Sequence, residues 1–349
     1  MEFADTPDQA DLRSVVRAFA QRHATPRQVR ATMAGPDGYD PKTWRRLSAE
    51  LGLTALAVPE RFGGAGAGPG EVAVAVEELG RVLLPSPYLS SAVAALALAG
   101  AAAACPDAAQ WYLPGLADGS VIATVALDAD VTAAGGTITG TARNVVDGAA
   151  ASLLLVRAGD ELVAVAAGDA AVEPLGTLDQ TRRQAAVRFD GVPALPAGPA
   201  ATAVALQRVL LAAECAAAAE HCLDVTVAYL MSRRQFGRPI GAFQALKHRA
   251  ADLKVAVTSA QATARAAVRS AETDVTLLPP LAALHCARTF VQVAGEMIQL
   301  HGGIGFTWEH EAHLFFKRAK STQLLLGPAS VLRTEIGREA GLLPGGAPS

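Results

Sequence analysis

The chain has 349 residues and a formal net charge of -3 at pH 7. At about 100–200 residues per domain, this length allows two or three domains. Hydrophobic residues make up 51% and charged residues 18% of the sequence, which supplies a sizeable core and excludes a disordered chain. The near-neutral charge, without a basic stripe carrying interleaved aromatics, argues against nucleic-acid binding.

The cysteines are scattered and form no C-x-x-C pair, which argues against a zinc pattern and a disulfide framework; they are Cys105, Cys215, Cys222 and Cys286. We expect buried thiols in a reducing cytoplasm, since no charged-then-apolar leader begins the sequence. His310 and His313 have no third ligand nearby, so no metal site is predicted. The longest apolar run, 89–105, is interrupted by serines and a glycine and predicts a buried helix, not a membrane span.

The first third of the sequence is expected to be helical. Apolar residues recur at helical spacing over 8–23 and 71–83, and a shorter helix is expected over 41–51. A loop rich in glycine and proline at 58–66 separates the second and third of these helices. The prolines at 85 and 87 end the third helix.

The middle of the sequence changes to short runs typical of strands, separated by glycine and aspartate turns. These runs lie at 121–127, 136–141, 153–156, 162–165 and 185–189. Their spacing predicts a small antiparallel β-barrel or sandwich.

The last part contains the longest expected helices, which lie at 202–231, 243–270, 279–300 and 308–326. Short loops join them, as in a four-helix bundle. The predicted class is therefore α+β and multidomain, with an N-terminal helical domain (1–118), a middle antiparallel β-barrel domain (119–198) and a C-terminal four-helix bundle (199–349).

Two loops between the long helices carry residues suited to ligand binding. The first, 233–241, holds three arginines, two glycines and an aromatic residue. Arginine forks suit phosphate or carboxylate oxygens, although cations also complement the end of a helix without any ligand. The second, 299–307, has glycines that allow close approach of a ligand to the backbone, although a glycine C-cap in a tight turn has the same pattern.

Taken with the N-terminal stretches 58–64 (Val-Pro-Glu-Arg-Phe-Gly-Gly) and 77–81 (Glu-Glu-Leu-Gly-Arg), the two loops resemble the acyl-CoA dehydrogenase family in order and spacing. The resemblance covers nearly the whole chain. It implies the same three-part fold, an FAD cofactor and α,β-dehydrogenation of an acyl-CoA thioester. In that family FAD lies at a subunit interface, where these loops of one chain reach the adenosine diphosphate of a flavin held mainly by its neighbour.

The resemblance also assigns residues. The R-x-x-F-G motif places Arg233 and Phe236 at the flavin, and the other family positions for FAD are Gln244, Gln299, Gly302 and Gly303. An arginine can neutralise pyrophosphate charge, and glycine leaves room for backbone contact. Arg208 matches a family arginine on the first bundle helix and is expected to bind substrate.

The family's catalytic base is absent from its usual places. The family alignment puts the common glutamate position at Leu326 and the less common one at Gln207, and neither side chain can accept a proton at neutral pH. Glu214 follows Gln207 by two helical turns, about 10 Å along the axis, and is the candidate for a displaced base. A buried, hydrogen-bonded or interface carboxylate is the alternative interpretation of Glu214.

The predicted β-domain departs from the family as well. The stretches that normally hold the isoalloxazine ring are not recognisable in 124–130 or 137–146, whereas 178–183 does resemble a family segment. The chain thus keeps the loops that serve a neighbour's flavin and lacks those that serve its own.

Three hypotheses follow. In the first, the chain is the base-lacking subunit of an α2β2 acyl-CoA dehydrogenase whose homologous partner carries the glutamate. By analogy its substrate would be a fatty or steroid side-chain acyl-CoA, and its electron acceptor an electron-transfer flavoprotein or similar protein. In the second, the chain is a homo-oligomeric dehydrogenase that uses Glu214. In the third, it is a flavin-free structural subunit.

Overall fold

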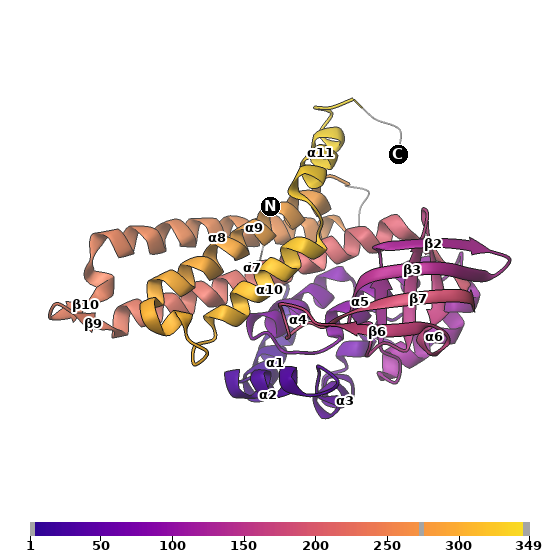
Figure 1. Ribbon diagram of the computed structural model, residues 1–349, viewed down its shortest axis with the longest axis horizontal. Coiled ribbons are helices and arrows are strands. Elements are labelled where there is room, and N and C mark those ends of the chain that lie inside the picture. The colour runs from indigo at the N-terminus through magenta and orange to yellow at the C-terminus, as the bar shows by residue number, and fades with distance from the viewer. Residues whose placement is uncertain (1–3, 272–275, 345–349) are drawn as a thin grey trace.

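The computed structural model describes residues 4–271 and 276–344 and shows a three-part architecture (Figure 1). Helices of the N-terminal part lie beside a long helical bundle, and the β-sheets lie at one end of the molecule. This arrangement confirms the predicted order of helical, β and helical parts.

The N-terminal part contains the predicted helices and two others. Its elements are α1 (Pro7–His23), α2 (Pro26–Ala34), α3 (Pro41–Ala49), η1 (Leu53–Ala55), η2 (Glu60–Phe62), α4 (Pro69–Arg81), α5 (Tyr88–Ala101) and α6 (Pro106–Asp118). The sequence did not predict α2 and α6. The start of α2 has a local signal, because Thr25 and Gln28 form a capping box around a proline in the first turn.

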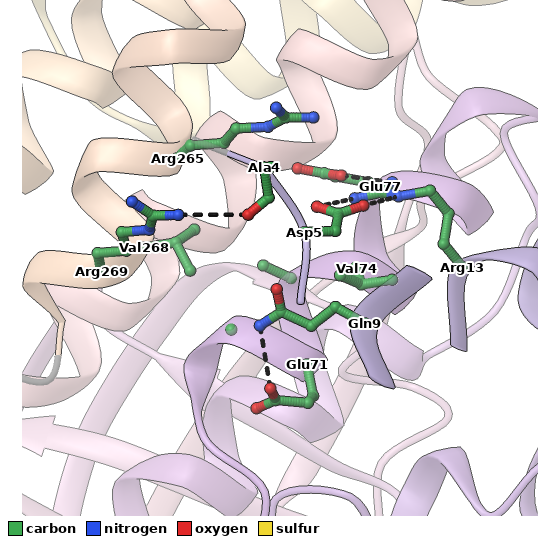
Figure 2. A pocket seen from close by; sticks show the side chains of 12 residues that line it. Ala4, Asp5, Gln9, Arg13, Glu71, Val74, Glu77, Arg265, Val268 and Arg269 are labelled. Atoms are coloured by element: carbon green, nitrogen blue, oxygen red, sulfur yellow. Dashed lines mark hydrogen bonds and ion pairs between the residues drawn. The ribbon is translucent and has the colours of Figure 1, made fainter. Parts of the chain in front are cut away.

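The N-terminal segment is fastened across α4 and the bundle by polar contacts (Figure 2). The Arg13 guanidinium lies 2.6 Å from Asp5 and 2.7 Å from Glu77 of α4. Gln9 donates a hydrogen bond to Glu71, and Arg269 of the bundle donates one to the backbone carbonyl of Ala4. These contacts fix α1 against the helices that carry the rest of the core.

The middle part consists of two four-stranded sheets, with orders β1-β4-β5-β8 and β2-β3-β7-β6. The strands are β1 (Ala123–Ala126), β2 (Ala129–Ala134), β3 (Thr137–Val146), β4 (Leu153–Ala158), β5 (Glu161–Ala166), β6 (Ala171–Leu175), β7 (Gln184–Pro193) and β8 (Leu195–Pro199), with η3 (Ala167–Asp169) between β5 and β6. The sheets share a buried core that includes Ile138, Leu154 and Phe189. The domain is therefore a sandwich and not a closed barrel, and β1 and β4 are parallel, whereas an antiparallel fold was expected.

Strand β4 links the two cores of the molecule. Leu153 and Leu155 belong to the core shared with the helices, whereas Leu154 and Val156 belong to the core between the sheets. Successive side chains of a strand point to opposite faces, so burial on both sides explains the continuous apolar run of β4. The sheet domain is therefore packed directly against the helices through a shared hydrophobic core.

The C-terminal part is the predicted bundle with an additional helix. Its elements are α7 (Ala200–Ser232), β9 (Arg234–Gln235), β10 (Arg238–Pro239), η4 (Ile240–Ala242), α8 (Gln244–Ser270), α9 (Leu278–His301), η5 (Gly302–Phe306), α10 (Ala312–Leu325) and α11 (Ala329–Glu339). The predicted start of the fourth helix at residue 308 is wrong, because 302–311 form η5 and a turn. Helix α7 is long and apolar enough for a membrane span, but 67% of its most apolar window is buried in the structure, as in a core helix.

The crossing of α4 and α7 depends on a glycine. A Cβ added to Gly80 would lie 2.4 Å from Cγ of Glu214. We expect Gly80→Ala to lower the free energy of unfolding by about 1–3 kcal/mol, because the two helices would have to separate. Gly100→Ala is the matched control, since an added Cβ there meets nothing within 4 Å and should stabilise α5 by up to about 1 kcal/mol. Chemical denaturation measures both variants, and equal effects would contradict this account of the crossing.

Candidate functional site

The first predicted loop forms a hairpin at the tip of the bundle. It connects α7 to α8, and Figure 1 shows it at the end of the bundle far from the β-sheets. Strands β9 and β10 pair around Phe236 and Gly237, which both have positive φ, 50° and 75°. This is the backbone of a tight two-residue turn, in which glycine is favoured at the second position.

The predicted flavin residues of this hairpin face solvent. Arg233, Phe236 and Gln244 are all exposed, and the Phe236 side chain is 90% exposed. The ring of Phe243 supports the hairpin, because the Arg238 guanidinium lies 4.1 Å from its centroid and Phe236 meets it edge-on. An exposed aromatic beside exposed arginine side chains suits an interface with another chain or a ligand.

The second predicted loop begins where α9 ends. Gln299, Gly302 and Gly303 are exposed, and Gly302 has a φ of 62°. A Cβ added to Gly302 or Gly303 would meet no neighbouring atom within 4 Å. The chain therefore leaves open space over this backbone, which a bound group could approach closely.

Stacked rings hold the ends of α7 and α9 together beneath these loops. The Tyr229 ring stacks on His301 at 4.4 Å, and His301 lies 4.3 Å from His310. The backbone N–H of Ala312 donates to Nδ1 of His310, which requires that nitrogen to be unprotonated. The structure thus brings the two predicted loops to the same end of the bundle.

The chemistry of this donor set is compatible with the adenosine diphosphate part of FAD. Exposed guanidinium groups, two amide side chains and an open glycine backbone are the groups that bind such anions and hydroxyls. There Arg233 and the Gly302–Gly303 backbone would hold the phosphates of FAD, whose distant isoalloxazine ring supplies the hydride acceptor when the cofactor is bound.

Arg208, the predicted substrate residue, lies on a different cleft. The cleft has a volume of about 1250 Å³ and is bordered by the β4–β5 turn, the start of α7 and α11. Both terminal nitrogens of the Arg208 guanidinium donate to the carboxylate of Glu335, at 2.5 and 2.9 Å. Helix α11, which the sequence did not predict, therefore already partners this arginine.

The two family positions for the base offer no proton acceptor in the structure either. Leu326 is buried at the end of α10, and Gln207 is partly buried on α7. The side chains at these two positions are an alkyl group and an amide, and neither accepts a proton at neutral pH.

Glu214 lies in a buried ion-pair cluster. It is 4% exposed, and its carboxylate accepts hydrogen bonds from Arg182 and from Arg318, the latter at 2.9 Å. Arg318 also binds Asp179 at 2.7 Å. Burial alone would raise the pKa of Glu214, but the two arginines outweigh it and hold this pKa below its usual value.

This arrangement favours a structural role for Glu214. Both carboxylate oxygens are engaged by guanidinium groups, and the adjoining cavity has a volume of only about 20 Å³. Arg318 was not predicted from the sequence, because an isolated arginine on a helix gives no local signal of a partner 104 residues away. The sequence did single out 178–183, the segment that supplies Asp179 and Arg182.

Other sequence predictions can be placed directly. Cys215, Cys222 and Cys286 are buried free thiols and Cys105 is partly buried. Burial raises the pKa of Cys286 to about 12, which makes it a weak nucleophile. Among residues 4–271 and 276–344, no group of three or more histidine, cysteine or acidic side chains is placed to hold a metal ion.

Removing the charge of Glu214 should destabilise the fold. We expect Glu214→Gln to lower the free energy of unfolding by about 3–5 kcal/mol, because two buried guanidinium groups lose their shared counter-ion. Glu50→Gln is the control, since it breaks an exposed pair with Arg46 and should cost less than about 1 kcal/mol. Urea denaturation tests this, and similar midpoints for the two variants would contradict the structural role.

The ring stack should make the bundle tip sensitive to acid. Burial first, and then His301 and Arg30, lower the pKa of His310, whose neutral form caps α10. A histidine with a lowered pKa in the folded state stabilises at high pH and loses this effect as the pH falls below about 6.5. We therefore expect the free energy of unfolding to fall on acidification, less so in His310→Gln, whose amide oxygen accepts the same hydrogen bond without titrating. Denaturation across this pH range tests it, with exposed His248→Gln as control; identical pH profiles for wild type and His310→Gln would refute it.

Known proteins share this sequence and architecture. Residues 6–120 match the family model for the acyl-CoA dehydrogenase N-terminal domain, and residues 199–341 match that for the C-terminal domain. The chain is 43% identical over 323 residues to the acyl-CoA dehydrogenase IpdE2 of Mycobacterium tuberculosis, across 92% of this chain and 94% of that protein.

Solved structures agree with these matches. A chain of the ChsE4-ChsE5 complex from Mycobacterium tuberculosis superposes with a TM-score of 0.90 and 31% identity, over 99% of this chain and 100% of that one. A chain of the Tcur3481-Tcur3483 steroid ACAD gives a TM-score of 0.89 and 30% identity, over 96% and 98%. The family models, the sequence identity and the fold together show that the chain described here belongs to the acyl-CoA dehydrogenase family.

Proposed function

We propose that the chain is one subunit of a heteromeric, FAD-dependent acyl-CoA dehydrogenase. Its two exposed loops would complete the binding of a flavin held mainly by a homologous partner, and the partner would carry the catalytic glutamate. The observation that carries this proposal is a separation within the chain. The flavin-type loops lie open at the bundle tip, whereas Leu326, Gln207 and the ion-paired Glu214 leave the usual base positions without a free carboxylate.

The comparisons support a partner-dependent enzyme. Family membership makes the chain part of a group of flavoprotein oxidoreductases that act on CH–CH bonds. Two similar solved structures carry names that describe paired chains, and one of these names describes a steroid enzyme. By analogy, we propose an α2β2 assembly that oxidises a bulky acyl-CoA such as a steroid side-chain ester.

The small cavity beside Glu214 also favours a partner that supplies the part of the acyl pocket around the base. Small-molecule pockets usually have volumes of about 300–1,000 Å³, far more than the cavity of about 20 Å³ beside Glu214. The described ion pairs fill the space around that carboxylate. A partner with an open pocket of its own would supply both the room for the acyl chain and the base that removes its α-proton.

Each chain residue would then have a limited role. Arg233 would counter the charge of the pyrophosphate, and Gln244 and Gln299 would offer amide hydrogen bonds. Phe236 would pack against the flavin at the interface with the partner. Arg208 remains the proposed substrate contact on its cleft. Because Glu335 already neutralises that guanidinium, we expect it to contact uncharged parts of acyl-CoA rather than its phosphates.

The surroundings of the reaction follow from the same proposal. An electron-transfer flavoprotein or a similar acceptor would reoxidise the flavin, and the cytoplasm is the expected compartment. A homo-oligomer that uses Glu214 as its base would require this carboxylate to leave both arginines, which the ion pairs oppose.

Co-expression with a homologue that carries the family glutamate tests the proposal. We expect the purified complex to contain FAD and to oxidise acyl-CoA, and the chain alone to do neither. Arg233→Ala and Gln299→Ala should weaken FAD binding to the complex by about 10–100-fold, because charge-assisted and amide contacts to the cofactor are lost. Arg143→Ala is the control, since Arg143 is exposed on β3 in the sheet domain.

The other outcomes discriminate between the hypotheses. Stoichiometric FAD and acyl-CoA oxidation by the chain alone would overturn the proposal. Normal FAD content and turnover in complexes with Arg233→Ala and Gln299→Ala would instead identify a flavin-free structural subunit.

A further inference from the structure

The loop between α9 and α10, residues 302–311, has two unlike ends. Its first end carries the open glycines Gly302 and Gly303. Its second end is a turn in which the His310 N–H donates to the carbonyl of Thr307. The end of α9 fixes the first side of η5, and the contacts of the second end fix the other side, so both ends determine where the glycine backbone lies.

A side chain from α2, which is distant in the sequence, donates hydrogen bonds to the second end. One terminal nitrogen of the Arg30 guanidinium, Nη2, lies 2.9 Å from the carbonyl oxygen of Trp308 and 3.0 Å from that of His310. It lies 3.5 Å from the carbonyl oxygen of Glu309 between them. One guanidinium group thus binds three successive carbonyl oxygens. Hydrogen bonds from a charged donor are stronger than those between neutral groups.

The helix that carries Arg30 is well anchored. Val29 and Met33 of α2 are buried in the main core, and the capping box of Thr25 and Gln28 fixes the first turn. Arg30 therefore links the loop to a helix that is fixed in the core of the N-terminal domain.

Neighbouring contacts reinforce the same end of the loop. The Trp308 ring packs edge-on against His313 at 4.5 Å, and the Lys317 ammonium lies 4.4 Å from the Trp308 centroid. His310, the last of the three residues bound by Arg30, caps α10 and contacts His301. The residues bound by Arg30 thus lie next to the stacked rings and the start of α10, within a few residues of the glycines.

We infer that Arg30 is a positioning residue for the flavin-facing loop. It touches neither flavin nor substrate and acts through the backbone of 308–310, so that Gly302 and Gly303 are held in the geometry that receives the cofactor. This role rests on the proposed function, because it assumes that the loop binds FAD in the assembled enzyme.

The experiment compares Arg30→Met, which removes the donors, with Arg30→Lys, which keeps the charge. Arg27→Met is the matched control, since Arg27 is exposed on the same helix. In the full chain, amide hydrogen exchange at 302–311 should become about tenfold faster in Arg30→Met and stay unchanged in α5. In the co-expressed complex, FAD release should accelerate by about the same factor, with an unchanged unfolding midpoint and partial rescue by Arg30→Lys.

Each contrary result has a distinct meaning. If exchange at 302–311 is unchanged in Arg30→Met, or if it accelerates while FAD release does not, the inference is overturned and the proposed function stands. A fall in the unfolding midpoint that matches the loss of FAD, without rescue by Arg30→Lys, overturns it too. A wild-type complex that holds no FAD would overturn the proposed function itself, and the role of Arg30 with it.

Discussion

A single buried carboxylate sets the arrangement of the three parts. Glu214 in the middle of α7 binds Arg182 of the sheet domain and Arg318 of α10, while Gly80 of α4 lies directly against it. Buried charges are tolerated only with matched partners, and Asp179 supplies the second negative charge. The sheet domain and the helices on both sides must therefore meet in one register for the cluster to close.

This constraint keeps both carboxylate oxygens of Glu214 engaged in ion pairs. The interior carboxylate that could have become a base is committed to ion pairs, and the family positions nearby hold Leu326 and Gln207. The groups suited to a cofactor lie instead at the bundle tip, where Tyr229 and His301 join two helix ends. The buried ion pairs and the residues proposed for cofactor binding are thus separated in space, which is consistent with the proposal of a subunit that completes another chain's site.

Local patterns predicted the elements and loops whose signals lie within a few residues. Helical spacing identified α7, α8 and α9, and glycine with arginine identified both tip loops, including Phe236 and Gly302. The sequence did not reveal the parallel β1–β4 pair, the partners of Glu214 or the hydrogen bonds of Arg30 with residues 308–310. Each of these contacts joins segments that are far apart in the chain. The start of α10 was misplaced since apolar residues from Trp308 onward continue a helical spacing through what is a turn.

The exposed aromatic residues of the two loops at the bundle tip have a consequence for how the chain is made. Phe236 is 90% exposed and Phe306 86% exposed, with Trp308 also in solvent. Uncovered aromatic surface of this kind promotes self-association of unassembled subunits. In the proposed two-chain assembly, surplus copies of this chain would therefore aggregate or be degraded, so balanced synthesis of the two polypeptides, for instance from one messenger RNA, would benefit the cell.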